Sequence, residues 1–454
     1  MGRFPDPADG QPSMQDATPQ HCDILVVGGG PAGSTAAALL AGRGWRVLQL
    51  EKDRHPRFHI GESLLPANLP LLQELGVLDA VRGIGLVKRG ADFPSGAPGG
   101  YSTFRFEDVL GDTPDHAFQV RRDQFDALLF DHARTCGVDA RDGLRVEQVA
   151  FVGDDVVADC RGDDGARISV RARYLVDASG RDTFLGSRFG SKRRNRRHAS
   201  AALFAHFDGV ARRPGEDAGN ISIYRFDFGW AWFIPLPDGL MSIGVVAGPE
   251  HFRRRRGDQA DFLLDTLRSH PEAGPRLEGA ALASPVHATG NYSYACRRMA
   301  GPRWLMVGDA WAFVDPIFSS GVFLAMHSAR LAVDVVDGSL RAPARERALQ
   351  RGFQRRVRRG VRAFSWFIYR FNTPAMRHLL AHPTDAFELR RGVISMLAGD
   401  VFDSRPVRRR LLAFKAIHGL FSLATLRQRL LQARRHRRQA PAAVERDGIG
   451  SGAA

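Results

Sequence analysis

A glycine-rich turn near the start of the chain has the spacing of a dinucleotide-binding site. Gly28, Gly30 and Gly33 follow a short apolar run at 23–27. The first glycine permits a tight turn, the second lets the backbone approach a pyrophosphate, and the third lets a helix pack closely on the strand. Glu51 lies 18 residues after Gly33, where a carboxylate can accept hydrogen bonds from a ribose diol. An unrelated α/β protein can carry such a turn, but strand, helix, second strand and terminal acid occur here in order and predict dinucleotide binding.

Two distant segments favour FAD over NAD as that dinucleotide. The apolar run at 304–307 leads into Gly308 and Asp309, whose carboxylate can hold a ribityl chain. Gly321 lies at the start of a predicted helix, whose N–H groups can face the pyrimidine end of a flavin or an anion. Arg122 precedes another predicted helix, where it can reach phosphate or the isoalloxazine side. The ordinary alternatives are a strand, loop and helix with an N-cap serine, and a solvated surface arginine.

Three further segments carry side chains with specific chemistry. Glu62 and Ser63 form a polar pair in an apolar context, although Ser63 alone is also typical of a helix N-cap. Trp230 and Trp232, at positions i and i+2, project from the same face of a predicted strand, and the ordinary alternative is an aromatic pair in a sheet core. Lys88 lies in a glycine-flanked turn between apolar residues, whereas a lone lysine is nearly always solvated.

Together these segments resemble the flavoproteins typified by the aromatic hydroxylases, and within them the FAD-dependent halogenases. The resemblance is nearest to the phenol- and pyrrole-directed branch, extends over residues 22–415, and keeps the family's motif order and approximate spacing. One departure is Phe323, where many relatives carry a histidine, and it changes the shape or polarity expected near the flavin. The motifs that carry the resemblance are the glycine turn, HIGESLLP at 59–66, K-x-G-A-x-F at 88–93, W-x-W-x-I-P at 230–235 and GDAxxFxDPxFSSGV at 308–322.

The resemblance implies an FADH2-dependent halogenase of secondary metabolism that acts on an electron-rich aromatic ring, of phenol or pyrrole type, free or bound to a carrier protein. FAD used as FADH2, O2 and a halide ion, chloride or bromide, are expected to give hypohalous acid. Lys88 is expected to hold that oxidant by a hydrogen bond or as a haloamine, because burial lowers the pKa of an ammonium. Trp230 and Trp232 are expected to line the passage to the substrate, and Ser320 and Gly321 to bind the halide through helix N-terminal dipoles.

The cofactor site implied by the motifs and by the resemblance is spread over distant parts of the chain. No second glycine-rich βαβ unit is visible in the sequence, so a separate flavin reductase is expected to supply the reduced flavin. No metal-binding set is predicted. The residues expected to bind the cofactor are Gly28, Gly30, Gly33, Glu51, Glu62, Ser63, Arg122, Asp309 and Gly321.

Two other functions compete with this one. A flavin monooxygenase or oxidoreductase on the same fold would lack halide chemistry, and a basic membrane-surface or nucleic-acid-binding protein is the non-enzymatic alternative. Lys88 and the W-x-W-x-I-P strand favour the halogenase, because hydroxylases need neither. A basic binding function would explain none of the motifs before residue 340.

The candidate residues require an α/β scaffold. The pattern predicts an FAD-binding, Rossmann-like parallel sheet, a mixed or antiparallel substrate-facing sheet, and a C-terminal helical region. Further strands are predicted at 167–177, 304–307, 199–207, 221–226 and 230–247, and helices at 322–336, 345–369, 384–397 and 407–431.

We expect the FAD-binding domain to be discontinuous in sequence. The expected division is a disordered tail at 1–21, an FAD-binding domain at 22–88, 112–183 and 288–338, a substrate-facing sheet domain at 89–111 and 184–287, a basic helical region at 339–440 and a disordered tail at 441–454.

Composition excludes several classes of protein. With 454 residues, 25% charged and 44% hydrophobic, the chain is long enough for two or three domains and unlike a disordered or fibrous protein. Its 4 cysteines are far apart with no C-x-x-C pair, so neither a disulfide framework nor a zinc site is expected. The first 21 residues lack the apolar core of a signal peptide and no long apolar run follows, so a cytoplasmic protein is expected.

Positive charge is concentrated at the C-terminal end. Residues 341–454 hold 25 Arg and Lys against 7 Asp and Glu, whereas the first 340 residues carry a net charge of −3. Because the charge is confined to one region, nucleic acid is not the expected partner. The ordinary interpretation is a set of helices with an arginine-rich solvated face. The alternatives are a docking surface for an acidic carrier protein or for an anionic membrane, the latter at the inner face of the membrane.

Overall fold

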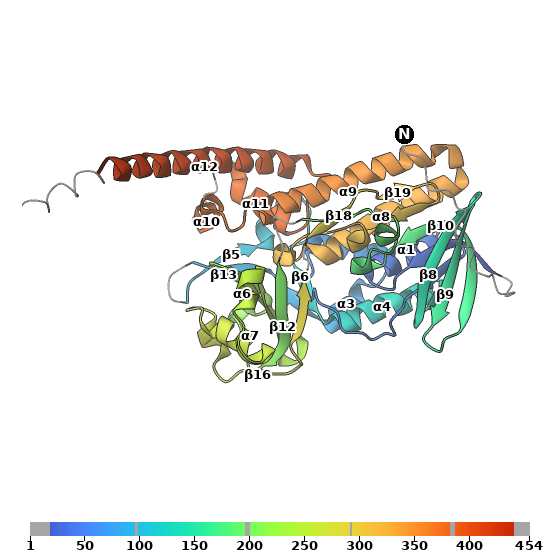
Figure 1. Cartoon of the computed structure of the whole chain (residues 1–454), viewed down its shortest axis with the longest axis horizontal. Coiled ribbons are helices and arrows are strands. Elements are labelled where there is room, and N and C mark those ends of the chain that lie inside the picture. The colour runs from blue at the N-terminus through green and yellow to red at the C-terminus, as the bar shows by residue number, and fades with distance from the viewer. Residues whose placement is uncertain (1–18, 96–98, 196–199, 291–292, 382–385, 440–454) are drawn as a thin grey trace, which may run out of the picture.

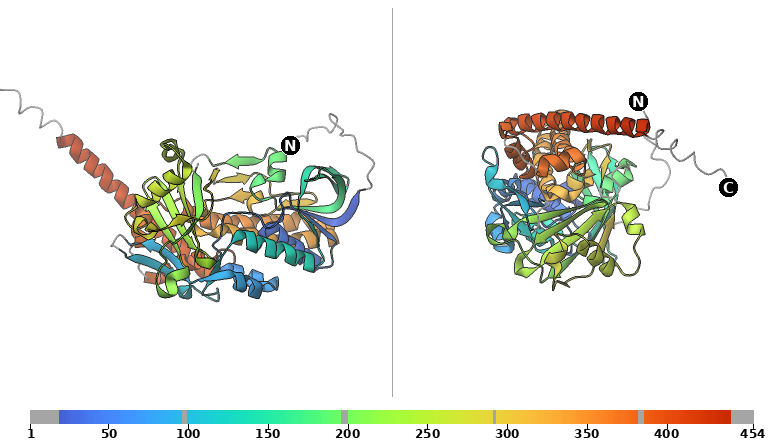
Figure 2. Two further views of the ribbon diagram at one scale, coloured as in Figure 1. Left: turned by 90° about the horizontal axis from the view of Figure 1, so that it is seen from below. Right: turned by 90° about the vertical axis from the view of Figure 1, so that its left-hand side faces the viewer.

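Two sheets stand side by side, and a group of helices lies along one side of both (Figure 1). The computed structural model describes residues 19–95, 99–195, 200–290, 293–381 and 386–439. Of the predicted tails at 1–21 and 441–454, residues 1–18 and 441–454 lie outside the described residues. Figure 2 shows that the last helix continues away from the body that the sheets form.

The first sheet is parallel at its centre. In sheet order its strands are β19 (Ala300–Gly301), β20 (Trp304–Met306), β10 (Arg167–Asp177), β1 (Gln20–Val27), β2 (Val47–Leu50) and β7 (Asp139–Arg141), and β9 (Asp155–Gly162) and β8 (Leu144–Val152) extend it beyond β10. β20, β10, β1, β2 and β7 run parallel to one another. Val27 pairs with both Leu50 and Asp177. The carboxyl ends of these strands therefore share one edge, which places Gly28 beside Glu51.

Helices cover this sheet and confirm the predicted βαβ unit. α1 (Pro31–Ala41) packs against α4 (Arg122–Thr135) and α8 (Ser320–Arg341). Its sequence, PAGSTAAALLA, consists mostly of small residues, and this lets the two neighbouring helices approach it closely. The predicted strand at 167–177 is β10, while β1 begins at Gln20, before the expected end of the N-terminal tail.

The second sheet is mixed, as predicted. In sheet order its strands are β16 (Ala281–Leu282), β12 (Ala201–Asp208), β15 (Met241–Ala247), β14 (Gly229–Pro235), β13 (Ile221–Phe226), β4 (Gly90–Pro94) and β5 (Tyr101–Arg105), and β17 (His287–Gly290) also pairs with β12. Neighbouring strands are antiparallel except β13 and β4, which are parallel. α7 (Gln259–Arg268) packs on β15 and β12, after the short α6 (Pro249–Arg253). β17 extends this sheet to Gly290, beyond the expected boundary at residue 287.

Smaller elements join the two sheets. The ribbon of β3 (Gly85–Lys88) and β6 (Ala117–Val120) is antiparallel. The remaining elements are α2 (Leu69–Glu74), α3 (Leu78–Ile84), α5 (Phe184–Arg188), and a sheet of β11 (Lys192–Arg194), β18 (Tyr294–Cys296) and β21 (Ala312–Phe313).

The C-terminal third is helical, as predicted. After α8 come α9 (Glu346–Ile368), α10 (Pro374–Ala381), α11 (Leu389–Leu397) and α12 (Arg405–Gln439). The sequence did not predict α10, whose Pro374 suits the first turn of a helix as well as it suits a break between helices. Part of the predicted helix at 384–397 lies outside the described residues, and α12 continues past the predicted end at 431. None of the described helices is long and apolar enough to cross a lipid bilayer.

Candidate active site

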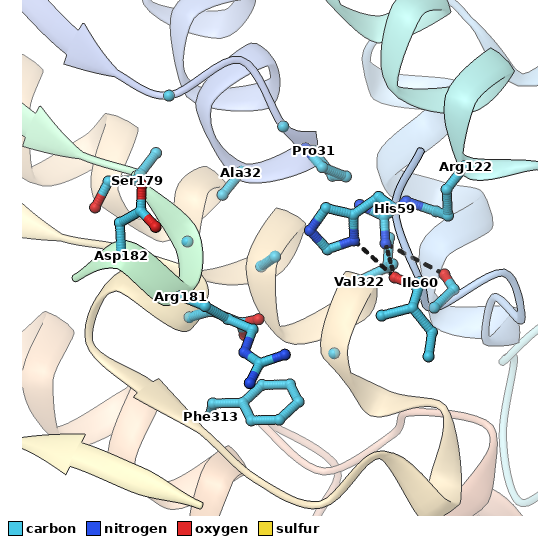
Figure 3. A pocket seen from close by; sticks show the side chains of 18 of the residues that line it. Pro31, Ala32, His59, Ile60, Arg122, Ser179, Arg181, Asp182, Phe313 and Val322 are labelled. Carbon is cyan, nitrogen blue, oxygen red and sulfur yellow. Dashed lines mark hydrogen bonds between the residues drawn. The ribbon is translucent and has the colours of Figure 1, made fainter. Parts of the chain in front are cut away.

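A cavity of about 600 Å3 lies where the carboxyl ends of the parallel strands face the second sheet. Figure 3 shows α1 contributing Pro31 and Ala32, with Arg181 on one side and Arg122 on the other. Among the residues predicted from the sequence, those that line the cavity are Gly28, Gly30, Glu51, Glu62, Ser63, Arg122, Trp230, Trp232, Asp309 and Gly321. The wall does not include Gly33, Lys88 or Ser320, which lie behind it.

The three glycines of the turn play different parts. Gly28 has φ +114°, and a Cβ there would lie 2.3 Å from the carbonyl oxygen of Ala178. A Cβ on Gly33 would lie 2.0 Å from the carbonyl oxygen of Gly28. At Gly30 the nearest atom to a Cβ would be Arg57 Nη2, at 3.5 Å, and the position faces the cavity. Gly28 and Gly33 therefore serve the packing of strand and helix, while Gly30 leaves room for a ligand at the N-terminus of α1.

Glu51 is held by the backbone around it. Its Oε2 accepts a hydrogen bond from the N–H of Gly29 at 2.6 Å, and its Oε1 accepts one from the N–H of Asp53 at 3.0 Å. Arg57 Nη2 lies 3.5 Å from the same Oε2 and lines the cavity. Arg57 was not among the predicted site residues, although its position six residues after Glu51 could have suggested it. It places a positive charge next to Gly30.

Arg122 is engaged with protein partners at the cavity wall. Its guanidinium forms a bidentate ion pair with Asp126, at 2.8 and 3.0 Å, and its Nη1 donates to the carbonyl oxygen of Ile60 at 2.7 Å. His59 Nδ1 lies 2.8 Å from that same oxygen (Figure 3). Burial lowers the pKa of His59 to about 4, so the ring is neutral at pH 7. Arg122 thus fixes the loop that carries Glu62.

Asp309 lies at the other side of the cavity, after β20. Burial raises the pKa of its carboxyl group to about 6, although the positive charges of Arg181 and Arg122 act to lower it. Its carbonyl oxygen accepts a hydrogen bond from the Tyr294 hydroxyl at 2.8 Å. The Arg181 guanidinium lies over the ring of Phe313, 5.2 Å from its centroid. Arg181 was not among the predicted site residues, although it follows the predicted strand at 167–177.

The start of α8 combines a helix N-terminus with a buried hydroxyl group. Ser319 has φ +56°, in the left-handed region, and turns the chain into the helix. Ser320 Oγ is buried and finds no hydrogen-bond partner among the described residues. A Cβ on Gly321 would meet nothing within 4 Å, so this position opens into the cavity. Such an end offers N–H groups and a positive dipole to an anion.

Trp230 and Trp232 stand on the cavity side of β14. Their ring centroids are 5.7 Å apart, with the planes at 49°. Trp232 Nε1 donates to Ser242 Oγ at 3.2 Å, and Gly244 of the next strand leaves space for the ring, because a Cβ there would lie 2.3 Å from it. Nearby, burial raises the pKa of the Asp315 carboxyl group to about 7, and an interaction with the Trp230 side chain partly offsets this rise. Asp315 belongs to the 308–322 motif, but the sequence analysis gave it no role.

Lys88 is enclosed at the end of β3. It is 1% exposed, and its Nζ donates to Ser63 Oγ at 2.9 Å and to the carbonyl oxygen of Leu64 at 3.0 Å. The ring of Phe106 lies 5.3 Å from Nζ. Burial without an anionic partner lowers the pKa of the ammonium to about 7. The solvated lysine, the ordinary alternative, is therefore excluded, and the buried ammonium that the resemblance implied is what the structure holds.

Glu62 forms a buried pair with His206, which the sequence analysis missed. His206 Nε2 lies 2.8 Å from Glu62 Oε1, and 144 positions separate the two residues in the chain. The ring of Phe58 packs edge-on against His206, with centroids 5.7 Å apart, and stacks on His287 at 4.3 Å. No local pattern signals this contact, because His206 comes from β12 of the second sheet.

Phe323 points away from the cavity. It is buried one turn into α8, with its ring 5.8 Å from that of Phe402 and 5.4 Å from that of His327. A Cβ on Gly399 would lie 3.3 Å from it. Phe323 therefore packs beneath the C-terminal helices and is not among the residues that line the cavity.

Comparison with known proteins agrees with this geometry. The family model described as FAD binding domain matches residues 21–365. Flavin-dependent halogenase armH1 of Armillaria mellea is 34% identical over 357 residues, which are 73% of this chain and 68% of the relative. The 1H-pyrrole-2-carbonyl-[peptidyl-carrier protein] chlorinase of Pseudomonas fluorescens is 28% identical over 84% of this chain and 90% of its own length.

Comparison with solved structures also finds flavoproteins and flavin-dependent halogenases. The myxobacterial chondrochloren halogenase CndH superposes with a TM-score of 0.74 and 31% identity, over 87% of this chain and 96% of its own. A flavoprotein/dehydrogenase from Cytophaga hutchinsonii superposes with a TM-score of 0.82 and 27% identity, over 89% of this chain and 100% of its own. Fold and cavity are those of an FAD-dependent oxidoreductase. The chain belongs to the flavin-dependent halogenases, and it is an enzyme with FAD as cofactor and a halide ion as co-substrate.

Proposed function

We propose that this enzyme halogenates an electron-rich aromatic ring of the phenol or pyrrole type in secondary metabolism. The aromatic wall of the cavity and the pyrrole chlorinase among the relatives support this substrate class. The observation that carries the proposal is the enclosed ammonium of Lys88, linked to the cavity through Ser63 at 2.9 Å. A flavin monooxygenase without halide chemistry has no use for such a lysine.

The residues present fit FAD. Gly30 leaves space for a phosphate beside Arg57 and the N–H groups at the start of α1. Glu51 and Asp309 can accept hydrogen bonds from ribose and ribityl hydroxyls. They follow β2 and β20, between which β1 and β10 lie, so strand spacing alone separates them by roughly 14 Å, as an extended dinucleotide requires. Glu62, Ser63, Arg122 and Gly321 complete the proposed cofactor site. Reduced FAD, with O2 and halide, supplies the oxidising equivalent that leaves as hypohalous acid.

Lys88 then holds the oxidant within the protein. With a pKa near 7, it is present at neutral pH both as an ammonium and as an amine. The ammonium donates a hydrogen bond to hypohalous acid, whereas the amine forms a nitrogen–halogen bond and releases water. In either form the halogen passes to a ring carbon and the ring loses a proton. Ser63 orients Nζ and stands between it and the cavity.

The tryptophans and the start of α8 have supporting roles in this proposal. Trp230 and Trp232 form a rigid wall, backed by Ser242 and Asp315, that keeps the organic substrate away from the flavin. The halide is bound at Gly321 by N–H groups of α8, with the Ser320 hydroxyl, which has no partner in the described part of the chain, behind it. The helix dipole favours an anion there.

We also propose two partners. A separate flavin reductase supplies FADH2, because neither the sequence nor the described strands show a second nucleotide-binding βαβ unit. The aromatic substrate is free or tethered to a carrier protein, and the carrier-directed chlorinase among the relatives supports the tethered form. If the carrier protein docks on the enzyme, a carrier-tethered substrate is expected to be halogenated faster than the same substrate free in solution.

The proposed function is tested by incubating the protein with FAD, NADH, a flavin reductase, bromide or chloride, and a panel of phenols and pyrroles. Mass spectrometry is expected to show a product with the halogen isotope pattern in place of hydrogen. Omission of halide, with all else present, is the control. A hydroxylated product that forms equally with and without halide would establish the monooxygenase alternative instead.

A further inference from the structure

The outer face of α9 carries a line of arginines that the halogenation chemistry does not use. The opposite face, with Phe353, Val357 and Phe364, is buried and packs on α8. Among the described residues, no carboxylate forms an ion pair with any arginine of this line. Successive arginines of the line are three or four residues apart, which places them on one face of the helix. They are Arg347, Arg351, Arg355, Arg358 and Arg362.

α12 has two different faces along its first half. Val407, Leu411 and Phe414 are buried where the helix packs on its neighbours. The opposite face exposes leucines: Leu412 is 59% exposed, Leu420 68% and Leu423 65%. Arg405 and Arg409 stand on that same face and are also exposed. A solvated helix is not expected to present large apolar side chains along one line.

α12 is strongly basic. Its 35 residues include 11 Arg and Lys and no Asp or Glu. Two nearby acids already have partners, since Asp403 pairs with Arg356 at 2.6 Å and Glu388 pairs with Arg391 and Arg410. Arg410 therefore turns inward, whereas Arg405, Arg408 and Arg409 pair with no carboxylate among the described residues.

These faces lie at one edge of the molecule. In Figure 1, α8 lies below α9, and α10 and α11 lie below α12, so the faces turned away from them share the upper edge. The far part of α12 projects past the rest of the fold (Figures 1 and 2). We call the arginine line of α9 together with the outer face of α12 the basic edge.

We propose that the basic edge binds the surface of an anionic lipid bilayer, with α12 lying in the plane of the interface. Leucines flanked by arginines suit the boundary between acyl chains and headgroups, because arginine stems lie along the apolar layer while their charges reach phosphate. α12 is about 52 Å long at 1.5 Å per residue, and a flat surface can cover that length. A second copy of this chain would be repelled, since it brings the same charge. The proposal does not rest on the halogenation chemistry.

The test is co-sedimentation of the full-length, FAD-loaded protein with vesicles. One set consists of phosphatidylcholine alone and the other of equal parts phosphatidylcholine and phosphatidylglycerol. The protein is expected to sediment with the anionic vesicles only, and added salt is expected to weaken binding. Substituting Leu412→Gln, Leu420→Gln and Leu423→Gln together is expected to reduce the partition coefficient roughly tenfold or more. Arg405→Glu, Arg408→Glu and Arg409→Glu together should do the same.

A matched control separates this edge from general charge effects. Arg254→Glu, Arg255→Glu and Arg256→Glu make the same charge change at an exposed cluster after α6, and binding is expected to remain largely intact. Absence of binding to anionic vesicles would overturn the proposal. So would an equal loss in the control variant, or unchanged binding in the leucine variant. Binding of a purified acidic carrier protein that the edge variants abolish, without any vesicle binding, would identify a protein dock instead.

Discussion

The Nζ of Lys88 donates a hydrogen bond to Ser63 Oγ at 2.9 Å, and of these two side chains Ser63 is the one that lines the cavity. An ammonium that is enclosed in this way is shielded from bulk water and lies one side chain away from the cavity that we propose holds the flavin. An oxidant formed in the cavity therefore meets Ser63 before it meets Lys88. This relationship makes Ser63 as important to the proposed chemistry as the lysine.

Ser63→Ala is expected to lower the yield of halogenated product about tenfold or more. The variant removes the oxygen that orients Nζ and leaves a buried donor with one partner fewer, at a cost of about 1–3 kcal/mol in stability. The measurement is product formed per NADH consumed. Ser63→Thr keeps the hydroxyl group and should restore most of the yield. If Ser63→Ala instead weakens FAD binding and leaves the yield per bound flavin unchanged, the side chain serves the cofactor alone.

Lys88 is expected to make stability rise with pH between about 7 and 10.5. Its pKa is lowered from 10.5 to about 7 in the folded protein, so over that window the unfolded chain binds a proton that the folded chain does not. Stability then rises with pH by at most about 1.4 kcal/mol per pH unit. Lys88→Met should remove this rise and be more stable than wild type at pH 7. Urea unfolding at several pH values measures the difference, and parallel curves for the two proteins would show that the lysine is not desolvated.

Gly30→Val and Gly33→Val are expected to fail in different ways. A side chain at Gly30 enters the cavity, so the variant should fold normally but lose FAD. A side chain at Gly33 meets the carbonyl oxygen of Gly28 at 2.0 Å, so the variant should lose stability by several kcal/mol. Flavin content after gel filtration and thermal unfolding separate the two effects. Retention of FAD by Gly30→Val would place the pyrophosphate elsewhere.

His206→Leu is expected to lower both stability and halogenation. It leaves the buried Glu62 carboxylate without its 2.8 Å partner, a loss of about 1–3 kcal/mol. His206→Gln can still donate to Glu62 and serves as the rescue variant. The readouts are thermal unfolding and the kinetic constants for the aromatic substrate. Equal activity of the leucine and glutamine variants would show that the pair has no part in shaping the cavity.

Local spacing predicted the scaffold well. The turn at Gly28 to Gly33, the acid at Glu51 and the strand at 167–177 occur as expected, because each depends on residues close together in the chain. The C-terminal helices were predicted for the same reason. α10 was missed because proline both ends one helix and begins another.

Contacts between distant segments could not be predicted. Glu62, in a loop, meets His206 of β12, 144 positions away, and neither spacing nor composition indicates this partner. The position of Phe323 against Phe402 likewise depends on how α8 meets the later helices. Lys88 was a candidate from its motif alone, and its enclosure behind Ser63 follows from the pairing of β3 with β6.

The measurement that tests the account most directly is the assay of Lys88→Ala with a flavin reductase, NADH, FAD, bromide and a phenol or pyrrole that wild type halogenates. The account predicts that FAD binding and NADH-dependent peroxide release persist while halogenated product falls by about a hundredfold or more, because the lysine acts after hypohalous acid has formed. Undiminished halogenated product from Lys88→Ala would contradict it.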